Sequence, residues 1–133
     1  DEFKQITVKK RENPITPDFI IEEQVLGYTH AQIGGYLATQ WKLPAKLSHA
    51  IIFHHRPELC PMDDLSPYVV NVANYVAKKT FKPDFEKQSS EVLENSILNK
   101  LALKETDILE LSDELRTDYG KSETFMQIAG IKV

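Results

Sequence analysis

The chain of 133 residues is 41% hydrophobic and 27% charged, which is the size and composition of one soluble globular domain with a sizeable core. Its formal net charge of −4 and its scattered lysines and arginines disfavour binding to nucleic acid. No apolar run approaches the roughly 20 residues that span a bilayer, and the N-terminus does not resemble a signal peptide, so we expect no membrane attachment.

The first part of the chain carries weak structural signals. The sequence opens with Asp1 rather than methionine, so we expect a processed product or a piece of a longer protein. Residues 1–16 hold one short apolar patch in a polar and basic stretch, which predicts a helix remnant or a loose segment. Thr16-Pro17 predicts the start of a short helix that ends at Gly27. We therefore separate an N-terminal segment, residues 1–16, from a helical domain, residues 17–133, which we expect to be part of a longer domain.

The next stretch predicts a helical hairpin. Thr29 is a good N-cap and Gln32 completes a capping box, so a helix should begin at His30 and run to about Trp41. Pro44 suits the first turn of a second helix, which should reach about residue 55.

Spacings of three and four predict which sides of the two helices meet. Two stripes are expected to face each other and bring two histidines into one core: His30, Ile33, Leu37 and Trp41 on the first helix, and Leu47, Ile51 and His54 on the second. Trp41 would then be a buried anchor, and Trp41→Ala should cost about 3–5 kcal/mol. Gly34-Gly35 in mid-helix costs about 1 kcal/mol per glycine relative to alanine, which predicts the close approach of another helix.

The second half of the chain also reads as helical. Residues 56–65 have a loop composition and contain the one cysteine, Cys60, which has no intrachain disulfide partner and fits a reducing, cytoplasmic compartment. Ser66-Pro67 starts a helix that is apolar nearly all round through Ala77, the mark of burial against several neighbours. We expect a polar loop over residues 80–90, a helical pattern from Ser90 to about residue 101, a last amphipathic helix over about 106–120, and one more turn in the tail. The predicted fold is all-α, a compact bundle of about five to seven helices.

Three histidines are the candidate metal ligands. His54-His55 lies near a helix end opposite His30, and a histidine cluster is what a metal site between packed helices needs. Alternatively, one histidine of the doublet is buried while its neighbour faces solvent, because adjacent helical positions point about 100° apart. Asp63 and Asp64 in the following loop are the nearest carboxylates, and no carboxylate is clearly placed to join the histidines.

Two asparagines lie three residues apart on the predicted buried helix. Asn71 and Asn74 must find hydrogen bonds there, so a structural network is the favoured interpretation and a ligand site is the alternative.

The order and spacing of these motifs resemble the HDOD domain, the HD-related output domain of bacterial signalling proteins and a relative of the HD and HD-GYP phosphohydrolases. The resemblance extends from about Phe19 through the region of Leu98 to Leu115 and implies an HD-domain-like helical fold. The matching residues are Glu23, Leu26-Gly27-Tyr28-Thr29-His30, Ile33-Gly34-Gly35, Leu37, Trp41, Leu43-Pro44, Ala50-Ile51, His54-His55 and Pro57.

What the resemblance implies for catalysis is mostly negative. Active HD-GYP relatives hold a bi- or trinuclear iron-type centre with an upstream His-Asp dyad, a glutamate, a histidine that His30 resembles, a pair that His54 and His55 resemble, and a later aspartate. This sequence contains no His-Asp dyad, and Asn74 stands at the position of that aspartate. Arg56-Pro57 does not continue into the Gly-Tyr-Pro motif of the cyclic-di-GMP phosphodiesterases.

We therefore expect a regulatory, non-catalytic HDOD-type module in cytoplasmic bacterial signal transduction, which binds a protein partner or a small signalling ligand and needs no cofactor. The alternative is a metal-dependent phosphohydrolase that acts on a cyclic dinucleotide or nucleotide, with a divalent metal on His30, His54 and His55. A purely structural interaction module is the third possibility. The oligomeric state stays open.

Overall fold

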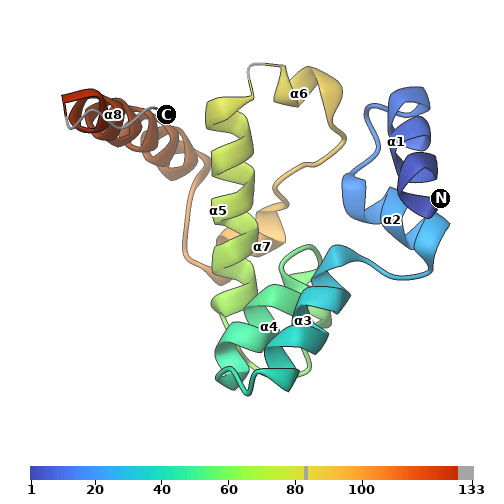
Figure 1. The fold of residues 1–133 in the computed structure, drawn as a ribbon. Helices are drawn as coiled ribbons and strands as arrows, with labels where there is room; N and C mark the ends of the chain where they lie inside the picture. Colours follow the sequence, from blue (N-terminus) through green and yellow to red (C-terminus); the bar gives the residue numbers. More distant parts are fainter. Residues whose placement is uncertain (83, 129–133) are drawn as a thin grey trace.

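The computed structural model describes residues 1–82 and 84–128 (Figure 1). In these residues every regular element is helical and no strand occurs, which confirms the predicted all-α helical bundle. The elements in chain order are α1 (Glu2–Glu12), α2 (Asp18–Leu26), α3 (His30–Gln40), α4 (Ala45–Phe53), the 3-10 turn η1 (Pro57–Leu59), α5 (Ser66–Phe81), α6 (Phe85–Gln88), α7 (Asn95–Lys100) and α8 (Glu105–Ile128).

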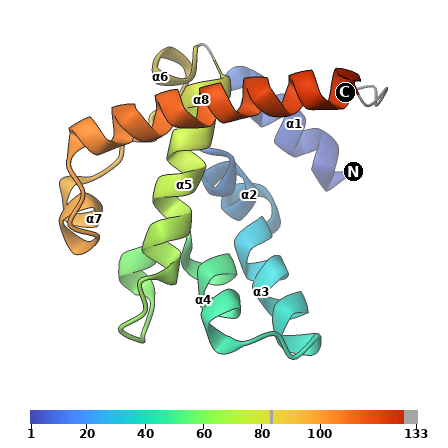
Figure 2. The same ribbon diagram turned by 90° about the vertical axis from the view of Figure 1, so that its left-hand side faces the viewer.

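Helix α5 is the element that connects the rest. Helices α4, α6, α7 and α8 all contact it, whereas α3 packs on α4 and α1 packs on α2. Figure 2 shows α8 crossing α5 at the end of the molecule opposite the α3–α4 hairpin. In the described part of the chain we find no helix of the length and apolarity needed to cross a bilayer.

The predicted start and stop signals of α2 and of the α3–α4 hairpin are mostly confirmed. The Thr29 hydroxyl accepts from the Gln32 N–H, and the Gln32 side chain accepts from the Thr29 N–H at 2.8 Å, which completes the capping box. Gly27 ends α2 in the left-handed conformation with φ 78°. Pro17 and Pro44 differ from the prediction, because each is the N-cap of its helix rather than the first helical residue.

The two glycines of α3 allow α4 to approach closely. A Cβ atom on Gly34 would lie 2.8 Å from Ile51 Cγ2, and one on Gly35 would overlap the side chain of Ile52. The predicted close approach of another helix is therefore confirmed.

Of the side chains predicted at the hairpin interface, Ile51 lies against Gly34, and His30 and His54 come together with ring centroids 5.6 Å apart, but the larger apolar residues were predicted wrongly. Trp41 is 70% exposed rather than a core anchor, and Ile33, Leu37 and Leu47 are exposed as well. The buried positions are instead small: Ala31, Gly35 and Ala38 on α3 and Ala50 on α4. The physical reason is that small residues let two helix backbones come together, so the large apolar side chains remain on the flank.

The main core lies between α5, α7 and α8. Its buried members are Val72, Val76, Ile97, Leu98 and Ile108. The sequence predicted that this helix is buried all round, and this is wrong. One side of α5 is open, because Val69, Val70 and Ala73 are exposed.

Three further predictions on element bounds are corrected. The polar loop over residues 80–90 contains α6, whose Phe85 is buried with its ring against Tyr75. The helix expected from Ser90 is confined to α7, and Val92 before it is exposed. The last helix does not stop near Gly120 but runs as α8 to Ile128.

Candidate metal centre

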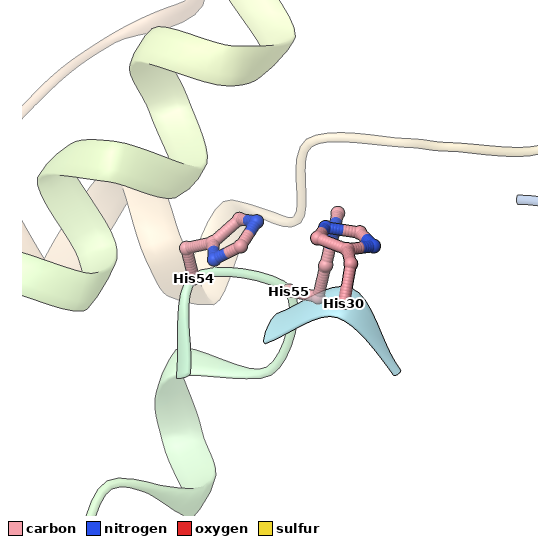
Figure 3. A group of neighbouring side chains, drawn as sticks. All are labelled: His30, His54 and His55. Carbon is pink, nitrogen blue, oxygen red and sulfur yellow. The ribbon is translucent and has the colours of Figure 1, made fainter. Parts of the chain in front are cut away.

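Three histidines gather where the N-terminus of α3 meets the C-terminal end of α4. His30 comes from α3, while His54 and His55 follow directly after α4, and Figure 3 shows their rings in one region. One nitrogen atom of each lies within 4.8 Å of the others. The ring centroids of His54 and His55 are 4.1 Å apart and both residues are half-buried, so the doublet does not divide into one buried and one solvent-facing histidine. The structure thus brings together the three residues that the sequence singled out.

Hydrogen bonds leave the Nε2 atoms of two histidines available as ligands. His30 Nδ1 lies 2.7 Å from Glu22 Oε2, and His54 Nδ1 lies 2.8 Å from the Ile51 carbonyl oxygen. Both oxygens are acceptors, so each Nδ1–H donates and the neutral ring keeps its lone pair on Nε2. Metal-binding histidines in proteins are commonly oriented by such a bond to a carboxylate or carbonyl.

Glu22 was missed by sequence reasoning. Its carboxylate also accepts from the His30 backbone N–H at 2.8 Å, so one side chain fixes both the start of α3 and the ring of His30. Glu22 lies on α2, eight residues upstream, and a short-range pattern does not connect them. The glutamate in the motif resemblance, Glu23, instead pairs with Arg56 at 3.0 Å.

The third histidine points its Nε2 at the first. His55 Nε2 lies 3.0 Å from His30 Nε2, and the His55 ring stacks on Phe19 with centroids 4.4 Å apart. Without an ion, the His55 Nε2–H donates to the lone pair on His30 Nε2, because the His30 proton is on Nδ1. Two imidazole nitrogens that each lie about 2.0–2.1 Å from one ion are separated by roughly 3 Å, so this pair already has the spacing of neighbouring ligands.

The electrostatics keep the doublet neutral. Burial lowers the pKa of His55 to about 3, with further lowering by the neighbouring imidazoles of His54 and His30. Burial also lowers the pKa of His54, against the opposing effect of its bond to the Ile51 carbonyl. Neutral imidazole is the form that binds a metal, so neither residue must lose a proton near pH 7 to become a ligand.

The carboxylates considered from the sequence lie elsewhere. Asp63 pairs with Lys100 at 2.9 Å, whereas Asp64 accepts from the Ser66 N–H at 2.9 Å and lies 3.0 Å from His49 Nδ1. Among the described residues, the cluster at this site consists of imidazoles, and Glu22 faces the outer nitrogen of His30. This donor set fits one ion that favours nitrogen ligands, such as zinc, and does not fit a multinuclear iron-type centre with shared carboxylates.

The two asparagines lie next to the histidines. The Asn71 amide donates to the His54 carbonyl oxygen at 2.7 Å, which is the structural role expected of it. Asn71 and Asn74 also line a small cavity of about 190 Å³, together with His55 and Phe19. A ligand role for either asparagine stays a prediction.

Comparison with protein families supports the motif resemblance. The model of the HDOD domain family matches residues 1–57, the range that contains α1 to α4 and all three histidines of the cluster. The match begins earlier than Phe19 and ends before α5, so the similarity expected for later residues stays a prediction. Comparisons with curated proteins and with solved structures gave no match.

Proposed function

We propose that the chain is a regulatory, non-catalytic HDOD-type module of cytoplasmic bacterial signal transduction, and that it binds a protein partner or a small signalling ligand. The family match over residues 1–57 supports the HDOD assignment. The observation that carries the non-catalytic part is the donor set, which among the described residues consists of three imidazoles with no carboxylate.

The donor set matters because of what phosphodiester hydrolysis demands. Two-metal hydrolases hold their ions about 3.5–4 Å apart and stabilise both the attacking and the leaving oxygen. Hard catalytic ions favour carboxylate and other oxygen ligands. Here the carboxylate of Glu22 accepts from the His30 ring and backbone, and the motif resemblance implies that Asn74 supplies an amide where active HD-GYP proteins have an aspartate. The site therefore lacks the side chains that would bridge two ions.

The alternative function has one observation in its favour. The ligand atoms of His30, His54 and His55 lie within 4.8 Å of one another, and hydrogen bonds present two of the rings for coordination. In a metal-dependent phosphohydrolase, these residues would hold a single divalent ion, which would supply Lewis acidity and an activated water.

Metal analysis and an activity assay separate the two functions. The chain is purified without a metal-affinity column, analysed for metals, and assayed on cyclic dinucleotides and nucleotide phosphodiesters with added manganese, iron or zinc. We expect no stoichiometric iron or manganese and no hydrolysis above that of His30→Gln, whereas bound zinc alone is compatible with the proposal.

The control variant is His49→Gln, which changes the histidine outside the cluster. Near one equivalent of iron or manganese, with hydrolysis lost in His30→Gln and His54→Gln but kept in His49→Gln, would overturn the regulatory proposal in favour of the enzyme.

A further inference from the structure

An exposed tryptophan marks the tip of the α3–α4 hairpin. Trp41 is the one tryptophan of the chain and is 70% exposed, with the exposed side chains of Leu43 and Leu47 close to it in sequence. The stripe continues along α3 with Leu37 and Ile33, one helical turn apart and both exposed. Scattered exposed leucines are ordinary, whereas a contiguous apolar patch with an aromatic residue is typical of a protein interface.

A second unpartnered apolar surface lies between α5 and α8. It is a groove of about 410 Å³, and two of its lining residues, Val69 and Leu111, are 52% and 40% exposed. Its lining is entirely apolar: Val69, Val72, Ala73, Val76, Leu101, Leu103, Leu111 and Leu115. A groove of this kind fits a large aromatic side chain, which gains the most from leaving water.

The α3–α4 hairpin and helix α8 differ in the sign of their charge. No acidic residue occurs between Glu23 and Glu58, and Lys42 and Lys46 flank the tip of the hairpin. Helix α8 carries seven acidic and two basic residues, and Asp107 and Glu114 lie four residues before and three after Leu111. Complementary charges of this kind orient two surfaces and speed their encounter.

We propose that Trp41 of one molecule docks into the α5–α8 groove of a second copy of the chain. Helix α8, which contributes Leu111 and Leu115 to the groove, and the turn between α3 and α4 lie at opposite ends of the molecule, so one chain does not join its own two surfaces (Figure 2). The contact is head-to-tail, and each added molecule presents a free tip and a free groove. Assembly consequently continues beyond the dimer unless a ring closes.

Sedimentation velocity over a series from micromolar to millimolar protein tests the contact. We expect the mass of the unmodified chain to rise with concentration beyond that of a dimer. Trp41→Ser removes the tip and Leu111→Glu places a charge in the groove, so each variant should remain a monomer. Val92→Ser changes a side chain that is 77% exposed and lines neither surface, and it should assemble like the unmodified chain.

The sharpest experiment mixes the two defective variants. Trp41→Ser keeps its groove and Leu111→Glu keeps its tip, so together they should form a one-to-one pair and nothing larger. The Trp41→Ser chain contains no tryptophan, so fluorescence reports solely on Trp41 of the other variant, and its emission should shift to shorter wavelength on mixing. The Trp41→Ser/Leu111→Glu double variant should cause no shift when it replaces Trp41→Ser.

Three outcomes would overturn the proposal: an unmodified chain that stays monomeric throughout the series, a Trp41→Ser variant that still assembles, or a mixture with neither pairing nor spectral shift. Circular dichroism checks that the variants are folded. Val69→Glu changes a lining residue on α5 instead of α8, and it replaces Leu111→Glu should the latter fail to fold.

Discussion

At the scale of single residues, the histidine cluster depends on groups that orient it. Glu22 holds His30, the Ile51 carbonyl holds His54, and the Phe19 ring stacks on His55. Glu22 and Phe19 both come from α2, whereas the Ile51 carbonyl belongs to α4, the helix that His54 follows. A site in which every ring is already oriented loses little conformational entropy when an ion binds.

We predict that Glu22→Gln weakens zinc binding by about 10- to 100-fold, the usual effect of removing a carboxylate that orients a metal-binding histidine. Competition with a chromophoric zinc chelator measures the affinity. Glu23→Gln is the matched control, since Glu23 lies next in the sequence but pairs with Arg56 rather than a histidine. Equal losses in the two variants would contradict the role assigned to Glu22.

The lowered pKa values of His54 and His55 predict a stability that falls in mild acid. Both groups have a pKa below the value of about 6.5 in the unfolded chain, and that of His55 lies at about 3. As the pH falls below about 6.5, the unfolded chain binds protons that the folded chain does not, so unfolding becomes more favourable. Urea unfolding midpoints should therefore decrease between pH 7.5 and pH 5.

The variant His55→Gln separates this effect from the titration of other groups. Whether the variant is more or less stable than the unmodified chain, its urea midpoint should depend less steeply on pH. The pKa of Asp64 is also lowered, chiefly by its hydrogen bonds to Ser66, and its contribution is lost only as the pH falls below about 4. An unchanged slope in His55→Gln would show that other groups cause the decrease.

At the scale of elements, the sequence predicted boundaries better than packing. The capping box at Thr29 and the helix end at Gly27 depend on residues that are close in the sequence, so the sequence alone is enough to place them. Which side of α3 packs on α4 depends on how closely the two backbones approach. Gly34 and Gly35 allow the closest approach, so their side of α3 faces α4 and the side with the larger apolar residues does not. The same holds for the site: the three histidines were found from the sequence, whereas Glu22 required the fold.

The exposure of Trp41 revises the predicted cost of removing it. A truncation of a core aromatic costs about 3–5 kcal/mol, whereas substitutions on the surface usually stay within about 0.5 kcal/mol. We expect Trp41→Ala to change the free energy of unfolding by less than about 1 kcal/mol, measured by urea titration at a concentration where the chain is monomeric. A loss of several kcal/mol would instead support the prediction from the sequence that Trp41 is a buried anchor.

The tight contact between α3 and α4 makes Gly35→Ala destabilising. Alanine gains about 1 kcal/mol of helix propensity over glycine, but its Cβ would overlap Ile52, and overpacking costs about 1–3 kcal/mol. Gly120→Ala in α8 is the matched control, since nothing lies within 4 Å of the added Cβ and the propensity gain should stabilise the chain. Denaturant unfolding of both variants gives the comparison, and a stabilised Gly35→Ala would argue against the close approach.

At the scale of the whole molecule, α5 lies at the junction of two parts. Helix α4 packs on it with the histidine end of the hairpin, while α7 and α8 pack on it around the main core. The Asn71 amide on α5 donates to the His54 carbonyl, so the helix that carries the core also holds the chain at the candidate metal centre. Helix α1 is peripheral, because it contacts α2 and buries none of its residues.

This arrangement predicts a graded pattern of amide hydrogen exchange. Backbone amides of α5 open only when the core separates, so they should exchange most slowly, whereas α1 lacks buried side chains and should exchange fastest among the longer helices. The hydrogen bonds from Ser90 N–H and Oγ to the Ile15 carbonyl fasten the chain after α1, so protection should rise again from about residue 15. Mass spectrometry of exchanged peptides measures the pattern, and α1 amides as slow as those of α5 would show that α1 is held by contacts beyond α2.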